Sequence, residues 1–344
     1  MTVRAALVGL GGIAGEHFAK LAELPAVEVV GICDVSPTLV EAVGERFGVG
    51  DGYTDFTRMM SETRPDTVHV LTPPATHPEL VQQALEAGAH VFVEKPIAPS
   101  HDAYRQLRTA AAEADRLLVE NLNYRFTGAL LEALELLQSG RLGTLVNFDV
   151  TFTVGLADRR GPYGDDAVPH FAHDLPGGAL RNFASHPASL AVALAGRHSW
   201  ARPDLRQLAS WGRGPDELRA LVGFEDVTAA LTITSHARPP VFHLAAHATE
   251  GAVEVDILAR RWRVFGSGRP LARVRDPLRL AGSEVAGAVS TVARALTSSQ
   301  DHFEGFRTLL HGFYAAVAGG GAPPLAEWEM DAVSLLVDEL LEPA

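Results

Sequence analysis

The sequence predicts a two-domain α/β protein, and three observations carry this prediction. In the first third of the chain, short β-branched runs alternate with amphipathic stretches. A glycine-rich turn follows the first of these runs. From about residue 143, longer alternating runs follow one another without helices between them. We therefore expect a parallel sheet covered on both faces over residues 1–125. Residues 126–344 should form an α+β domain with a large open, mainly antiparallel sheet.

The expected elements of the N-terminal domain follow in regular order. Strands are expected at residues 3–8, 27–32, 67–71, 90–93 and 117–121, with helical stretches between them at 13–24, 37–47, 77–88 and 101–114. Pro37 and Gly88 provide a helix start and a helix stop.

The C-terminal domain is expected to be richer in strands. Its predicted strands lie at residues 143–154, 218–224, 226–236, 241–249, 252–258 and 260–266, and its predicted helices at 178–195, 300–318 and 325–341. Residues 201–216 and 266–279 are rich in Gly, Pro and Arg, which is typical of irregular loops.

The composition excludes several classes of protein. The 344 residues are 47% apolar and carry a formal net charge of −13, so neither nucleic acid nor an anionic membrane is an expected partner. The single cysteine, Cys33, excludes an internal disulfide and suits a reducing compartment. Neither a signal-peptide pattern nor an apolar run of membrane-spanning length is present, so we expect a cytoplasmic protein.

The glycine-rich turn has the form of a dinucleotide-binding motif. The run VGLGGIAGEHF places a strand, the glycines and a helix start in that order, through Gly9, Gly11, Gly12, Ile13 and Ala14. Glycines allow close backbone approach to a pyrophosphate, which the helix N-terminus attracts. Asp34, 20 residues after Ala14, is placed to accept hydrogen bonds from a ribose. These features predict a Rossmann domain that binds NAD rather than NADP; the alternative is a glycine turn that binds nothing.

Lys95 is unusual because only two of the 29 basic residues are lysines, Lys20 and Lys95. It follows the strand at 90–93, at the sheet edge where open α/β folds bind ligands. An arginine does not give up its proton in proteins, whereas a partly desolvated lysine can exchange one. The alternative is a lysine whose stem covers apolar surface. Pro96 ends the strand ladder, and its cis or trans state is left open.

Four segments in order, VGLGGIAGEHF, VHVLTPPATHPELV, HVFVEKPIA and ENLNYRF, resemble the Gfo/Idh/MocA family of NAD(P)-dependent sugar and cyclitol oxidoreductases. The segments LLQSGRLGTLVNFDVTF and GGALRNFASHPASLAVALAG extend the resemblance to about residue 200.

The resemblance implies a catalytic lysine at Lys95 and an acid/base histidine at His186. The family places an acid four residues before that histidine, but this chain has Asn182. An amide can orient the imidazole without supplying charge, so the proton relay lacks its usual carboxylate.

Other site residues are expected around these three. For the cofactor they are Thr72, Pro73, Pro74, His77, Glu94 and Asn123, with Lys95 counted among them. For the substrate, beside Lys95, Asn182 and His186, they are Arg125, Tyr163, His170 and His173. His77 is interpreted as a helix-start residue and not as a catalyst. A metal site at His170, His173 and Asp174 fits the spacing only, and no metal is expected.

The leading hypothesis is hydride transfer between NAD and a secondary alcohol or ketone of a sugar, a cyclitol or a related metabolite. Two alternatives stay open: an enzyme that retains NAD and uses transient oxidation for elimination or hydrolysis, and a sugar- or NAD-sensing regulator. Small apolar side chains in 227–234 and 243–248 suggest that the second sheet packs against another subunit, so a homodimer or homotetramer is expected.

Overall fold

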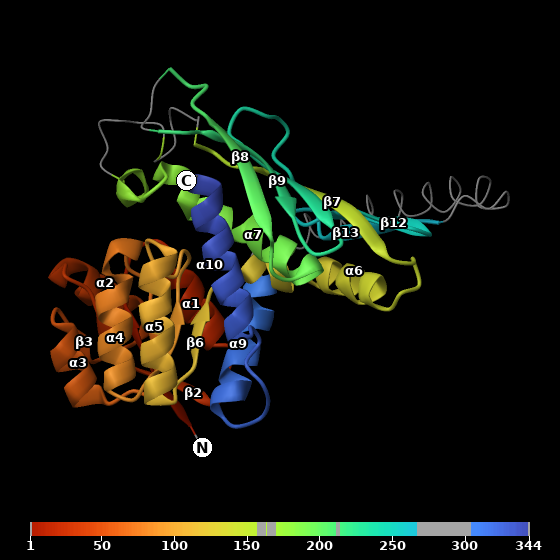
Figure 1. Cartoon of the computed structure of the whole chain (residues 1–344). Coiled ribbons are helices and arrows are strands. Elements are labelled where there is room, and N and C mark those ends of the chain that lie inside the picture. Colours follow the sequence, from red (N-terminus) through yellow and green to blue (C-terminus); the bar gives the residue numbers. More distant parts are fainter. Residues whose placement is uncertain (1, 157–162, 164–169, 211–213, 267–303, 343–344) are drawn as a thin grey trace. The chain divides into compact units, whose positions relative to one another are not determined.

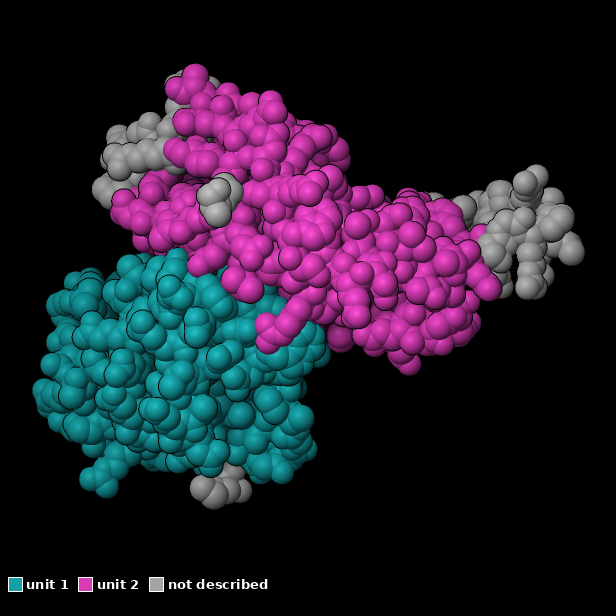
Figure 2. Space-filling model, viewed as in Figure 1, with its two compact units in different colours: residues 1–122, 306–334 teal, residues 123–305, 335–344 magenta. Residues whose placement is uncertain are grey.

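The computed structural model describes residues 2–156, 163, 170–210, 214–266 and 304–342. It divides into two compact units, coloured separately in Figure 2. Unit 1 comprises residues 1–122 and 306–334, and unit 2 comprises 123–305 and 335–344. Residues 306–334 therefore pack with the N-terminal unit, which differs from the single boundary proposed at 125/126.

Unit 1, in which Figure 1 labels β2, β3 and β6, is built on a six-stranded parallel sheet in the order β3-β2-β1-β4-β5-β6. Its strands are β1 (Val3–Val8), β2 (Val27–Cys33), β3 (Gly52–Tyr53), β4 (Thr67–Val70), β5 (His90–Val93) and β6 (Leu118–Glu120). The chain reverses its direction of travel across the sheet between β1 and β4, which are neighbours. This is the switch point at which doubly wound sheets bind dinucleotides.

The helices of unit 1 alternate with its strands. They are α1 (Ala14–Leu21), α2 (Pro37–Phe47), α3 (Phe56–Thr63), the short 3₁₀ turn η1 (Pro74–Thr76), α4 (His77–Glu86) and α5 (His101–Ala114). The side chains of Ser36, Asp55 and Ser100 accept hydrogen bonds from backbone N–H groups three residues on. Because these donors have no partner within the helix, each cap fixes where its helix starts.

Helix α9 (Glu304–Val317) and the first part of α10 (Glu327–Leu341) complete unit 1. Phe306 and Phe313 of α9 are fully buried, and both rings pack against Phe92 of β5. The core of the parallel sheet is therefore closed by residues more than 200 positions away in the sequence.

Unit 2 contains a seven-stranded sheet in the order β13-β12-β11-β7-β10-β9-β8. Its strands are β7 (Leu145–Thr153), β8 (Trp200–Arg206), β9 (Glu217–Gly223), β10 (Thr228–Thr234), β11 (Phe242–Ala248), β12 (Gly251–Asp256) and β13 (Arg261–Gly266). All neighbours are antiparallel except β7 and β10, which are parallel.

The helices of unit 2 are η2 (Asn123–Phe126), α6 (Gly128–Gln138), η3 (Phe171–Asp174), η4 (Gly178–Leu180) and α7 (Arg181–Ala195). Helix α6 packs on β12 and β13, and α7 packs on β7 and β10. Phe148, Val150 and Phe152 of β7 are buried, whereas the alternating Asp149 is exposed. The period of two thus gives this strand one buried face.

Two sequence predictions need correction. Residues 201–206, expected to be loop, lie in strand β8, which pairs only with β9. Its Pro203 discouraged a strand assignment, yet an edge strand tolerates proline because one side of its backbone has no partner strand. Strand β3 and helix α3 were not predicted at all. The loop proposed at 266–279 lies outside the described residues beyond Gly266.

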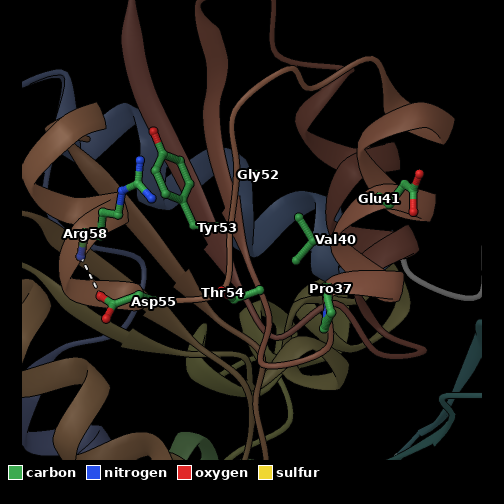
Figure 3. A pocket seen from close by; sticks show the side chains of 8 residues that line it. All are labelled: Pro37, Val40, Glu41, Gly52, Tyr53, Thr54, Asp55 and Arg58. Atoms are coloured by element: carbon green, nitrogen blue, oxygen red, sulfur yellow. Dashed lines mark hydrogen bonds between the residues drawn. The ribbon is translucent and has the colours of Figure 1, made fainter.

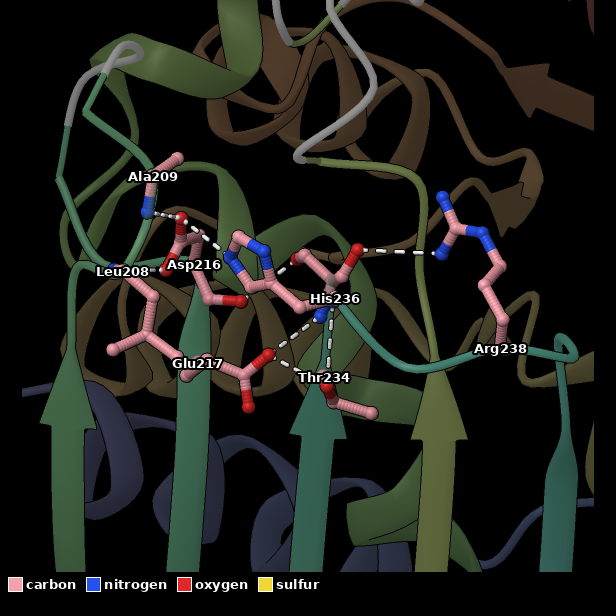
Figure 4. Close-up of polar contacts among 8 residues, drawn as sticks. Leu208, Ala209, Asp216, Glu217, Thr234, His236 and Arg238 are labelled. Carbon is pink, nitrogen blue, oxygen red and sulfur yellow. Dashed lines mark hydrogen bonds and ion pairs between the residues drawn. The ribbon is translucent and has the colours of Figure 1, made fainter.

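A polar cluster joins the loop after β8 to the ends of β9 and β10 (Figure 4). The Asp216 carboxylate accepts hydrogen bonds from the N–H groups of Leu208 and Ala209, and it contacts His236 Nε2 at 3.1 Å. Burial opposes ionisation of Asp216, but these contacts prevail and its pKa is lowered. The cluster holds one end of the sheet.

Within the described ranges, no helix is both long enough and apolar enough to cross a membrane.

Candidate functional site

The glycine turn lies between the ends of β1 and β4. Gly9 has φ +89°, and a Cβ on it would lie 2.7 Å from the backbone nitrogen of Thr72. Only glycine fits there. A Cβ on Gly11 or Gly12 would meet no described atom within 4 Å. The N-cap residue of α1 is Ile13, and no side chain caps the N–H groups at this helix start. The turn therefore offers open space next to an uncapped helix N-terminus, which is how a Rossmann domain receives a pyrophosphate.

Asp34 follows β2 and is held by backbone donors. Its Oδ2 accepts a hydrogen bond from Leu10 N at 2.7 Å, and its Oδ1 accepts one from Ser36 N at 2.9 Å. These bonds fix the carboxylate beside the glycine turn, and each oxygen retains a further lone pair for a hydroxyl donor. The next residue, Val35, is 91% exposed.

A cavity of about 310 Å³ lies beside this strand end (Figure 3). Its wall is formed by α2, by β3 with the residues that follow it, and by the first turn of α3: Pro37, Val40, Glu41, Gly52, Tyr53, Thr54, Asp55 and Arg58. Asp34 N donates to Tyr53 O, so a backbone hydrogen bond connects the residue that carries the carboxylate to the cavity wall.

His77 ties together the loops that follow β4 and β5. Its Nε2 lies 2.8 Å from Thr72 O and its Nδ1 lies 3.0 Å from Pro96 O. It is the first residue of α4, in agreement with the helix-start interpretation, and Pro73 and Pro74 lead into it through η1. The Lys95–Pro96 peptide bond is cis. The contacts of His77 therefore fix the segment that carries Lys95.

Two carboxyl groups, Glu94 and Glu120, influence the pKa of Lys95. Burial lowers the pKa of Lys95, and the negative charges of Glu94 and Glu120 oppose this effect. Burial also disfavours the charged form of Glu94, but a hydrogen bond from His17 and the nearby positive charges lower its pKa to about 2. Burial raises the pKa of Glu120 to about 7. One carboxylate beside Lys95 is thus permanently ionised, while the other titrates near neutrality.

In unit 2, α7 carries Asn182 and His186, both 4% exposed. Asn182 Nδ2 donates to Tyr163 Oη at 3.1 Å. The His186 ring lies edge-on to Tyr124, with centroids 4.7 Å apart. Burial raises the pKa of Tyr163, against the effect of the hydrogen bond from Asn182. Asn182 is therefore hydrogen-bonded to Tyr163, another candidate substrate residue. The position of Asn182 on its helix did not predict this contact.

His170 is the N-cap residue of η3, and His173 lies within η3. The Tyr163 and His170 rings lie 4.5 Å apart, and His170 Nδ1 accepts a hydrogen bond from Ala172 N. Both ring nitrogens of His173 are shielded from solvent and have no hydrogen-bond partner among the described residues. Among those same residues, no group of three His, Cys, Asp or Glu side chains is arranged to hold a metal.

Asn123 and Arg125 lie on the 3₁₀ turn η2, which packs against α7. Both are half-buried, and Arg125 extends over the Phe126 ring. Asn123 is predicted to bind the cofactor and Arg125 the substrate, and both assignments stay predictions.

Sequence reasoning missed four residues of this region. Tyr124 contacts His186, Glu120 lies near Lys95, His17 contacts Glu94, and Arg181 anchors α7. Tyr124 and Glu120 both lie within ENLNYRF, the segment that also supplied Asn123 and Arg125. The charged Arg181 inside the apolar stretch 178–195 was a further available signal.

Fold and site together define a protein with a dinucleotide-binding Rossmann unit and a second unit built on an open sheet. A family model described as "Oxidoreductase family, NAD-binding Rossmann fold" matches residues 3–122, and the "GFO/IDH/MocA C-terminal domain" model matches 130–254. The chain belongs to the Gfo/Idh/MocA family.

Curated relatives include D-glucoside 3-dehydrogenase of Escherichia coli, 29% identical over 42% of this chain, and levoglucosan dehydrogenase of Pseudarthrobacter phenanthrenivorans, 25% identical over 64%. The aligned segments span 41% and 63% of those relatives, so the chain matches less than two thirds of either.

The fold recurs in solved structures. An oxidoreductase from Agrobacterium radiobacter, in complex with NAD⁺, L-tartaric acid and magnesium, superposes with a TM-score of 0.81 at 16% identity, covering 99% of this chain and 96% of that one. A levoglucosan dehydrogenase with NADH and levoglucosan gives a TM-score of 0.80 at 19% identity, covering 99% and 96%.

Proposed function

We propose that the protein is an NAD-dependent oxidoreductase that acts on a secondary alcohol, or the corresponding ketone, of a sugar or sugar-like metabolite. The observation that carries this proposal is the placement of the Gly9 turn and Asp34 at the switch point of the parallel sheet, with Lys95 at the same edge. The printed names of the relatives, dehydrogenases of a glucoside and of levoglucosan, support the substrate class.

The residues of unit 1 fit NAD. The open space at Gly11 and the uncapped start of α1 suit a pyrophosphate, and Asp34 suits ribose hydroxyls. A carboxylate there repels the additional phosphate of NADP. The exposed Val35 and the adjoining cavity offer apolar surface for the adenosine half. When bound, NAD supplies a nicotinamide that accepts or returns a hydride.

Lys95 provides the proton chemistry in unit 1. Alcohol oxidation requires a group that takes the hydroxyl proton, and ketone reduction requires one that donates it. A lysine with a lowered pKa can serve in both directions. His77 and Glu94, each anchored by hydrogen bonds, hold the segment that carries Lys95.

In unit 2, we assign substrate binding to the cluster around α7. His186 is proposed as an acid/base, oriented by the Tyr124 ring. His173 has two shielded nitrogens suited to sugar hydroxyls, and Tyr163 and Asn182 add a linked hydroxyl and amide. Asn182 cannot supply the charge that an acid would give His186, so Lys95 carries a larger share of the proton transfer.

The deciding experiment incubates purified protein with NAD and a panel of sugars and cyclitols, following absorbance at 340 nm and product mass. We expect net NADH formation with at least one substrate. Lys95→Met should lower kcat by about 100-fold or more, since general acid–base catalysis contributes this much. Lys20→Met, the change at the other lysine, should leave kcat unchanged. Product without net NADH, or NAD binding without turnover, would contradict the proposal.

Cofactor choice has its own test. Asp34→Asn should lower NAD affinity by about tenfold or more, since hydrogen bonds to a charged group contribute about 1.5–3 kcal/mol. The preference for NAD over NADP should shrink with it. Asp102→Asn, at an exposed carboxyl group in the first turn of α5, is the control. Unchanged NAD affinity in Asp34→Asn, by titration calorimetry, would refute the assignment.

We also propose that the protein is a cytoplasmic homo-oligomer. The outward face of the second sheet presents small or polar half-exposed side chains, among them Thr151, Ala230, Thr232 and Ala245. Such a face suits packing against a second copy. Light scattering should give a dimer or tetramer, and Ala245→Arg should yield a folded monomer. A monodisperse monomer from the parent chain would contradict this.

A further inference from the structure

A chain of hydrogen bonds crosses the core of unit 1 and ends at Glu94. Glu94 Oε1 lies 3.0 Å from His17 Nε2, and His17 Nδ1 lies 2.8 Å from His69 Nδ1. His69 Nε2 lies 2.8 Å from Tyr314 Oη, which contacts Thr67 Oγ1 at 3.1 Å. None of these five side chains belongs to the predicted catalytic set.

This chain of hydrogen bonds is shielded from water. His17, His69 and Thr67 are fully buried, and Tyr314 is 5% exposed. The His17 ring is also enclosed by the rings of Phe92 and Phe306. A buried polar group without a partner costs about 1–3 kcal/mol, so each link must be satisfied by its neighbours.

The donor and acceptor of each hydrogen bond between Thr67 and Glu94 can be assigned. With His17 neutral, one arrangement satisfies every link: Thr67 donates to Tyr314, Tyr314 to His69, His69 to His17, and His17 Nε2–H to Glu94. With His17 protonated, His17 Nδ1–H donates to His69. His69 then donates to Tyr314, and Tyr314 donates to Thr67. In both arrangements His17 donates to Glu94, and the low pKa of Glu94 keeps that group a carboxylate.

Glu94 has one further donor and several charged neighbours. Asn121 Nδ2 donates to the same Oε1 at 2.6 Å. The charges that act on Lys95 are those of Glu94 and Glu120, and Glu94 also acts on His77. Since Glu120 titrates near neutrality, Glu94 is the constant negative charge next to Lys95.

We propose that His17, held by His69 and Tyr314, is a positioning residue that keeps Glu94 ionised and thereby sets the proton affinity of Lys95. The chain binds no substrate and reaches the reaction only through this charge. The inference rests on the proposed function insofar as Lys95 is the group that handles the proton.

The composition makes the test direct, because Lys20→Arg leaves Lys95 as the only lysine. In this background, with ¹³C-labelled lysine, the Cε signal titrates with Lys95 alone. Glu94→Gln should lower the pKa of Lys95 by about one unit, the lower end of the effect of a close opposite charge. His17→Leu should lower it by less, and His17→Gln, which retains an N–H donor, should restore it.

Two tyrosine variants provide a milder comparison. Tyr314→Phe removes the hydroxyl that fixes the His69 tautomer and should lower the Lys95 pKa slightly. Tyr104→Phe is the matched control, because Tyr104 is equally buried in unit 1 but its hydroxyl bonds to Glu327 O instead. It should leave the Lys95 titration unchanged. These variants keep the test decisive if His17→Leu does not fold.

An unchanged Lys95 titration in Glu94→Gln and Tyr314→Phe would overturn the inference. So would a rise in the Lys95 pKa in His17→Leu, which would mean that Lys95 responds to charge on His17 itself. The measurement needs neither NAD nor turnover, so it is independent of the proposed function. In turnover assays, the pH limb that reports Lys95 should move by the same amount as the NMR titration.

Discussion

The guanidinium of Arg181, the first residue of α7, donates to the carboxylate of Asp338 near the end of α10, and its second nitrogen donates to Glu342 at 2.8 Å. Arg181 is 1% exposed. Its third nitrogen donates to Pro176 O. All contacts lie within unit 2, and they fix the end of the helix from which Asn182 projects.

We expect Arg181→Met to lower the free energy of unfolding by about 2–3 kcal/mol, because removal of one partner leaves the carboxylates of Asp338 and Glu342 without their donor. Urea denaturation measures the loss. The loss stays below that of a fully buried pair, since the Glu342 side chain is 48% exposed. Arg58→Met, at the exposed pair with Glu62, should have no measurable effect. Equal behaviour of the two variants would contradict the anchoring role.

The two glycines of the turn should respond differently to alanine. Gly9→Ala should destabilise the protein by about 2 kcal/mol or more, because its φ is left-handed and the new Cβ meets Thr72 N at 2.7 Å. Gly11→Ala should fold with normal stability but bind NAD at least about tenfold more weakly, since its methyl group occupies the space for the pyrophosphate. Thermal melts and calorimetric titration separate the two effects. Normal NAD binding by Gly11→Ala would place the cofactor elsewhere.

Glu120 should make stability fall as the pH rises. Its folded pKa, about 7, exceeds the usual 4.5, so the folded state binds more protons between these values. The contribution to stability is complete below pH 4.5 and is lost as the pH rises through about 7. At about 1.4 kcal/mol per unit of pKa, the loss is at most about 3.5 kcal/mol.

Denaturation at a series of pH values tests this. Glu120→Gln should remove the decline in that window, and Glu45→Gln, at an exposed carboxyl group, should retain it. A Glu120→Gln curve parallel to that of the parent would show that Glu120 ionises normally.

Asn182→Asp should restore the acid that the family pattern leads one to expect. A carboxylate one helical turn from His186 should raise the histidine pKa by about one unit. Histidine NMR titration measures this directly, and the acid limb of kcat/KM should move with it. Asn147→Asp, on an exposed position of β7, is the control. An unaltered His186 titration would mean that the two side chains do not interact.

Local patterns predicted most of the fold correctly. The β-branched run of β1 and the Pro37 start of α2 are encoded within a few residues, so their elements could be identified. Strand β3 has only two residues and no periodicity to detect. Strand β8 was hidden by Pro203, whose tolerance depends on an edge position that only the assembled sheet defines.

The site was predicted in part, for a similar reason. Motifs identified Asp34 and Lys95 because their chemistry depends on a strand end. The contact between Tyr163 and Asn182, and the hydrogen bonds from His17 to Glu94, join segments far apart in the chain. Such contacts follow from packing and leave no periodic trace in the sequence.

The closing of unit 1 by α9 has a consequence for synthesis on the ribosome. The N-terminal strands emerge first, but Phe92 and His69 meet Phe306, Phe313 and Tyr314 only after nearly the whole chain has been translated. Until then the nascent Rossmann sheet exposes apolar surface, and His69 lacks its Tyr314 partner, the condition under which chaperones bind. A fragment ending at residue 125 should therefore aggregate, and supplying residues 306–334 on a second chain should make it soluble.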